Sequence, residues 1–86
     1  MYVIVERLSS AHEPPRESGI LHARIWRGPA LPKAEAGSSY LLGEGNDCFF
    51  GTPKVLEVIK QSDQEVVLKL PYQEVKVSLS KDNPWP

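Results

Sequence analysis

The chain contains 86 residues, of which 41% are apolar and 24% are charged, and its formal net charge is −1. This length suits one small domain, and the apolar content exceeds that of a disordered chain. The balanced charge argues against a nucleic-acid-binding protein, and no apolar run approaches the ~18 residues of a membrane-spanning helix.

The start of the chain lacks the marks of a secretory leader. A β-like run at residues 2–8 follows Met1 directly, without a basic start, a long apolar stretch or a small-residue cleavage site. We therefore expect a cytoplasmic protein. Cys48 is the only cysteine, so an internal disulfide cannot form. A core of this size rarely supplies more than ~3–5 kcal/mol, which makes self-association a reasonable expectation.

The first half of the chain alternates short apolar runs with long loops. Pro14, Pro15 and Gly19 mark the first loop as exposed, and Gly28, Pro29 and Pro32 mark the second. We predict strands at residues 2–8 and 20–27, loops at 9–19 and 28–37, and brief strands or loop anchors at 40–42 and 48–50 around a turn at 43–47.

The second half of the chain predicts a three-strand meander. Residues 54–60 are rich in β-branched side chains, and residues 65–70 alternate so that Val66, Leu68 and Leu70 share one face. The polar residues 61–64 between them are typical of a hairpin turn. Pro71 and Tyr72 form a corner into a strand at residues 74–80. In that last strand Val75, Val77 and Leu79 alternate with polar residues, as in a half-buried strand.

Five or six short strands without helical periodicity predict a mainly β fold. We expect a small antiparallel barrel or sandwich, SH3-like or OB-like in scale, because closing the sheet would hide its edges. Residues 1–80 form this single domain. Residues 81–86 form a C-terminal tail in which Pro84 prevents a further strand.

The strand at residues 20–27 is the main candidate for a binding surface. Period-two alternation places one set of side chains in the core (Leu21, Ala23 and Ile25) and another on the opposite face (Ile20, His22, Arg24 and Trp26). A row of imidazole, guanidinium and indole groups suits stacking on a base or binding an anionic or aromatic partner. Two alternatives are packing on the wall of the domain and a subunit interface.

Trp85 lies between Pro84 and Pro86 in the tail. An indole exposed to water is unfavourable, so we expect Trp85 to dock on its own domain or on a neighbouring subunit. The alternative is that this segment is a ligand for another protein, as proline-rich segments often are.

Catalytic and metal-binding patterns are weak. Cys48 lacks the context of a known nucleophile, and the flanking Phe49 and Phe50 favour a place in the core. The possible metal ligands His12, His22, Asp47 and Cys48 lack zinc-site spacing, and Gly43 and Gly45 do not form a phosphate-binding loop. We expect no catalytic residue, no metal and no cofactor.

These features favour a non-enzymatic protein-interaction module that forms a homodimer. Its binding residues are expected to be His22, Arg24, Trp26 and Trp85. The alternative is a β-barrel that binds a small molecule or nucleic acid, although the charge argues against the latter. A fold of this kind does not by itself specify a ligand.

Overall fold

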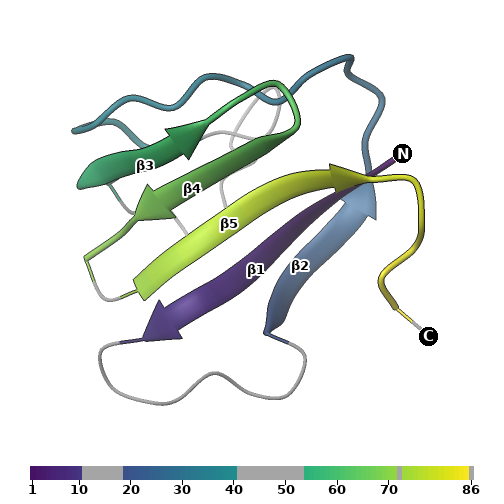
Figure 1. Ribbon diagram of the computed structural model, residues 1–86, viewed down its shortest axis with the longest axis horizontal. Helices are drawn as coiled ribbons and strands as arrows, with labels where there is room; N and C mark the ends of the chain where they lie inside the picture. Colours follow the sequence, from purple (N-terminus) through teal and green to yellow (C-terminus); the bar gives the residue numbers. More distant parts are fainter. Residues whose placement is uncertain (11–18, 41–53, 72, 86) are drawn as a thin grey trace.

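A computed structural model describes residues 1–10, 19–40, 54–71 and 73–85. Five antiparallel strands form one sheet in the order β2-β1-β5-β4-β3 (Figure 1). They are β1 (Tyr2–Ser10), β2 (Ile20–Ile25), β3 (Glu57–Gln61), β4 (Glu65–Lys69) and β5 (Gln73–Ser80). The mainly β prediction is confirmed.

The meander formed by β3, β4 and β5 also matches the prediction in order and pairing, although β3 begins at Glu57 rather than at residue 54. In the β3–β4 turn, the Ser62 amide donates to the Glu65 carbonyl at 2.8 Å, and the Ser62 hydroxyl accepts a bond from the Glu65 amide at 3.1 Å. At the β4–β5 corner, the Leu70 amide donates to the Gln73 carbonyl at 2.8 Å. Polar turn residues thus satisfy the backbone groups where the strands end.

The predicted barrel or sandwich is not confirmed, because the described sheet is open. β2 and β3 are its two edges, and they do not pair with each other. Instead, the described chain beyond β2 runs past the end of the sheet and along β3 (Figure 1). The fold is nevertheless compact: its radius of gyration is 12.2 Å, against about 12 Å expected for a folded chain of this length.

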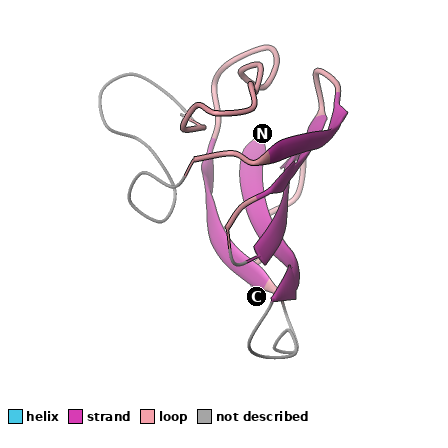
Figure 2. Ribbon diagram, turned by 90° about the vertical axis from the view of Figure 1, so that its left-hand side faces the viewer, coloured by secondary structure: helices cyan, strands magenta, loops and turns pink. Residues whose placement is uncertain are grey.

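The core lies on one face of the sheet. Val3 and Val5 of β1 lie opposite Leu79 and Val77 of β5, and Val77 in turn lies opposite Val66 of β4. Residues directly opposite each other share a face, so these side chains form one continuous layer. Figure 2 shows the loop that follows β2 on one side of the sheet. The buried core residues are Val3, Val5, Leu31, Ala34, Tyr40, Val55, Val66, Leu68, Leu70, Val75 and Val77.

The segment 31–40 closes the core beside β3. The Leu31 amide donates to the Asp63 carbonyl at 2.9 Å, and the Gly37 amide donates to the Val55 carbonyl at 2.7 Å. The Gln61 side chain bonds both the amide and the carbonyl of Ala34. These contacts hold the segment against β3 without adding a strand to the sheet.

Several predicted features fall outside the described residues. They are most of the loop at 9–19, the runs at 40–42 and 48–50 apart from Tyr40, and the turn at 43–47. Within the described part of the chain, β1 continues two residues past its predicted end, to Ser10. No helix there has the length and apolar character needed to cross a membrane.

Candidate functional site

The register of β2 places its side chains on faces that differ from the prediction. Arg24 lies opposite Val3, and His22 lies opposite Val5, whose side chains are both 0% exposed. His22 and Arg24 therefore extend from the core-facing side of the sheet. Ala23 and Ile25 extend from the other face, and Ile25 is 64% exposed. Their predicted place in the core is wrong.

The cause is a β-bulge near the start of β2. Val5 pairs with His22, but Glu6 pairs with Ile20, so Leu21 is an extra residue. A bulge adds one unpaired residue to a strand, so the side chains after it point to the opposite faces from those that simple alternation predicts. Leu21 therefore packs against the core as predicted, whereas the alternation from His22 onward is inverted.

Arg24 and Trp26 lie together, as their spacing predicts. The guanidinium carbon of Arg24 is 6.0 Å from the centroid of the Trp26 ring, which is within the range of a cation–π interaction. The Trp26 ring packs against the core cluster, and its Nε1 is buried with no hydrogen-bond acceptor among the described residues. This arrangement favours wall packing for Trp26. The binding role of the pair remains a prediction.

Gly28 permits the close approach of the Trp26 indole to the backbone. A Cβ at residue 28 would lie 2.9 Å from the indole Nε1 and 3.2 Å from two ring carbons. We expect Gly28→Ala to lower the free energy of unfolding by about 1–3 kcal/mol, because the rigid ring must shift against the core. Urea denaturation measures this loss. The loss should shrink in a Trp26→Phe background, where the ring is smaller, and an equal loss there would contradict the contact.

The face opposite the core carries an apolar patch over β1 and β2. Tyr2 lies opposite Ile25, Ile4 opposite Ala23, and Glu6 opposite Ile20. We define the β1–β2 patch as these apolar residues: Tyr2, Ile4, Ile20, Ala23 and Ile25. The described loop after β2 lies on the other side of the sheet (Figure 2). The patch thus offers apolar surface on the open side.

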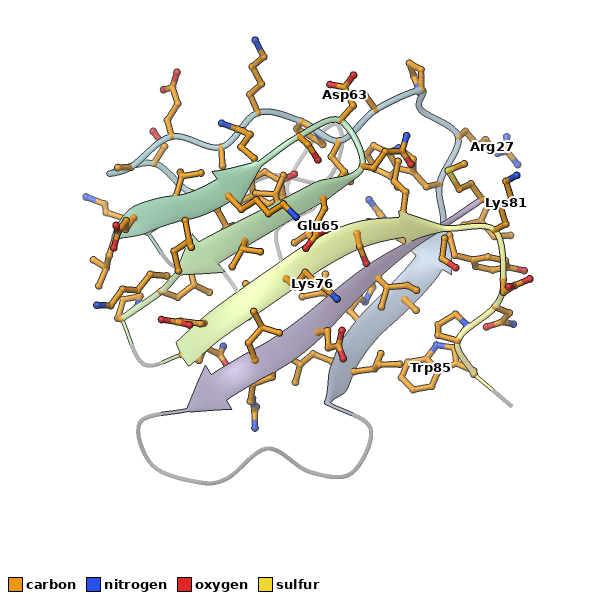
Figure 3. All side chains as sticks on the ribbon, in the orientation of Figure 1. Arg27, Asp63, Glu65, Lys76, Lys81 and Trp85 are labelled. Atoms are coloured by element: carbon orange, nitrogen blue, oxygen red, sulfur yellow. The ribbon has the colours of Figure 1, made fainter. Side chains whose placement is uncertain are left out.

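The rest of that face is mainly polar, although Val67 of β4 also lies on it, opposite Lys76. Lys76 lies opposite Glu6, and their charged groups are 3.5 Å apart. Glu74 lies opposite Lys69, and Glu65, which is labelled in Figure 3, lies opposite Ser78. The Glu6–Lys76 ion pair is partly exposed to water and therefore adds little stability. On its β5 side the patch is therefore bounded by polar residues, Ser78 and Ser80, and then by the Glu6–Lys76 ion pair.

Sequence reasoning missed this patch although a signal was present. Residues 2–5 are apolar without interruption, which is typical of a strand with apolar contacts on both faces. Val3 and Val5 supply the core face, and Tyr2 and Ile4 supply the other. The continuous run, rather than an alternating one, was the available indication of a second apolar surface.

Trp85 remains 44% exposed in the tail, on the side of the molecule where β2 lies (Figure 3). Its amide donates to the Asn83 side-chain oxygen at 3.0 Å, and the Asp82 amide donates to the Ser80 hydroxyl at 3.2 Å. These local bonds turn the chain after β5. The docking of Trp85 on a second subunit remains a prediction.

The described residues provide little for catalysis or metal binding. Among them, no three His, Cys, Asp or Glu side chains gather where they could hold a metal ion. Burial raises the pKa of the Tyr40 phenol, whose hydroxyl donates to the Pro32 carbonyl at 2.8 Å. Tyr40 is therefore neutral and structural. His12, Asp47 and Cys48 lie outside the described residues.

Comparisons with protein-family models, curated proteins and solved structures find no match to this chain. Its function must therefore be argued from its own surfaces.

Proposed function

We propose that this protein is a non-enzymatic protein-interaction module that self-associates as a homodimer. The observation that carries the proposal is the β1–β2 patch, with Ile25 64% exposed at its outer margin. Exposed apolar surface bounded by polar residues is typical of protein interfaces. Trp85, also partly exposed on the β2 side, adds an aromatic group of the kind enriched in interfaces.

A second copy of this chain is a suitable partner for two reasons. The formal net charge of −1 gives two copies little electrostatic reason to stay apart. In addition, a domain of this size gains from apolar surface buried between subunits, because its own core is small.

The alternative of a ligand-binding barrel has less support. A barrel holds a small ligand in the interior that a closed sheet encloses. The described sheet has two separate edges, and one of its faces is packed with the valine-rich core. No described feature favours nucleic acid over a protein partner.

The proposal is tested by introducing a charge into the patch. We expect Ile25→Asp to raise the dimer dissociation constant at least about tenfold, because burying an isoleucine contributes about 1.5–3 kcal/mol and each tenfold in affinity corresponds to about 1.4 kcal/mol. Sedimentation velocity over a range of protein concentrations measures this change.

Ile59→Asp is the matched control, because Ile59 is 49% exposed on β3, the other edge of the sheet. It should leave the dissociation constant unchanged. Wild-type protein that sediments as a monomer at high concentration would refute the proposal, as would equal effects of the two substitutions.

A further inference from the structure

The two edges of the sheet are protected to different extents. At β3, the segment 31–40 bonds to Asp63, Gln61 and Val55. A bulge between Val58 and Lys60 also interrupts this edge, and bulges and lysines both hinder edge pairing. At β2, the residues that follow the Leu21 bulge pair regularly with β1, from His22 to Ile25.

The hydrogen-bond pattern shows which backbone groups of β2 point away from β1. The Trp26 amide donates to the Met1 carbonyl at 2.8 Å, and the Arg7 amide donates to the Gly19 carbonyl at 2.7 Å. Odd-numbered residues of β1 therefore bond toward β2. In an antiparallel ladder, alternate residues of a strand direct their backbone groups toward the same neighbour, and the residues between them direct theirs away from it. The amides and carbonyls of Ala23 and Ile25 therefore point outward from the sheet edge.

We infer that β2 pairs in antiparallel fashion with β2 of a second copy, joining two five-stranded sheets into one. This inference rests on the proposed self-association and specifies its geometry. A shared two-fold axis matches the same edge on both subunits and closes the assembly as a dimer. Because a bulge interrupts the β3 edge and the segment 31–40 bonds beside both of its ends, a β2–β3 contact that would extend into a filament is disfavoured.

The side chains select one register. Centring the pair on Arg24 would place two arginines directly opposite each other, which is destabilising. Centring it on Ala23 would oppose Ile25 to the bulged Leu21. Centring it on Ile25 joins the two Ile25 side chains and places each Arg24 opposite the partner's Trp26, a favourable cation and aromatic pair.

Disulfide cross-linking tests this register in a Cys48→Ser background, so that only the introduced thiol reacts. Opposed residues in a hydrogen-bonded antiparallel pair have Cα atoms about 5.5 Å apart, which a disulfide spans. We expect Ile25→Cys to give a covalent dimer on mild oxidation. Ala23→Cys is the matched control: the two copies of residue 23 are offset by four residues, roughly 13 Å along the strand, and should not link.

A second measurement uses the unmodified protein. The Ile25 amide should exchange its hydrogen more slowly as protein concentration rises, because it donates to the partner only in the dimer. The Ile59 amide on β3 should show no such dependence.

The outcomes separate this inference from the proposed function. Selective linking through residue 25, with concentration-dependent protection of its amide, would support edge pairing. A dimer with no link at residue 25 and no such protection would overturn the inference and leave face-to-face self-association standing. Linking through residue 23 alone would overturn the register. A protein that stays monomeric would overturn both proposals.

Discussion

Replacing Leu68 with alanine is expected to lower the free energy of unfolding by about 2–5 kcal/mol, the largest effect predicted for this chain. Leu68 is 0% exposed on β4 and lies opposite both Val58 of β3 and Val75 of β5. Its loss removes apolar contacts and leaves a cavity between three strands. Stability is typically only about 0.05–0.15 kcal/mol per residue, so this change removes a large share of the total.

Urea denaturation at one fixed protein concentration measures the effect, because self-association would otherwise make the apparent stability concentration-dependent. Leu56→Ala is the matched control, since Leu56 is 55% exposed. The control should change the free energy of unfolding by no more than about 0.5 kcal/mol. Similar losses for both substitutions would contradict the assigned core.

The sequence predicted the strands of the second half well because their two faces differ in chemistry. Val75, Val77 and Leu79 alternate with charged and polar residues, so period two fixes both the strand and its buried face. The turn residues between β3 and β4 are polar and close the hairpin with local bonds. Local patterns of this kind are fully present in the sequence.

The faces of β2 were predicted less well because they depend on its neighbour. Apolar residues occur at both even and odd positions of this strand, namely Ile20, Leu21, Ala23 and Ile25, so alternation alone does not identify the core face. The pairing with Val3 and Val5 decides it, and the bulge at Leu21 inverts the simple alternation. Neither the long-range pairing nor the bulge is marked by a glycine or proline within β2.

The sequence pattern also did not show whether the sheet is open or closed. Five short strands are compatible with an open or a closed sheet, and the difference depends on what lies along each edge. Here the segment 31–40 binds along β3, and Ala34 and Tyr40 join the core from outside the sheet. Irregular segments carry no periodicity, so their contribution to the core was not predicted.

The same features explain how the candidate site changed. The predicted row of His22, Arg24 and Trp26 does share one side, but Trp26 is packed against the core. Ile25, predicted to be buried, instead has the largest exposed fraction among the large apolar residues described. The proposed interface therefore moves to the opposite face and the outer edge of β2, while remaining on the same strand.

The second large effect concerns Tyr40, for which we expect a loss of stability at alkaline pH that a phenylalanine substitution removes. Burial raises the pKa of Tyr40 above its ordinary value of 10.0, because the phenolate would be poorly solvated beside the core. The unfolded chain therefore releases this proton at a lower pH than the folded protein. The stabilising contribution is fully present below about pH 10 and is lost as pH rises toward the folded pKa.

In that range the wild-type free energy of unfolding should fall by up to about 1.4 kcal/mol per pH unit because of Tyr40 alone. Tyr40→Phe should itself cost about 0.5–1.5 kcal/mol at neutral pH, because it removes the hydrogen bond to the Pro32 carbonyl. Denaturation at several pH values gives the difference between the two proteins, which cancels the other titrating groups. That difference should be constant below about pH 10 and shrink above it as the wild type loses its advantage. Parallel curves across the whole range would show that Tyr40 titrates alike in the folded and unfolded chains, and hence that its hydroxyl is not held in the buried position beside Pro32.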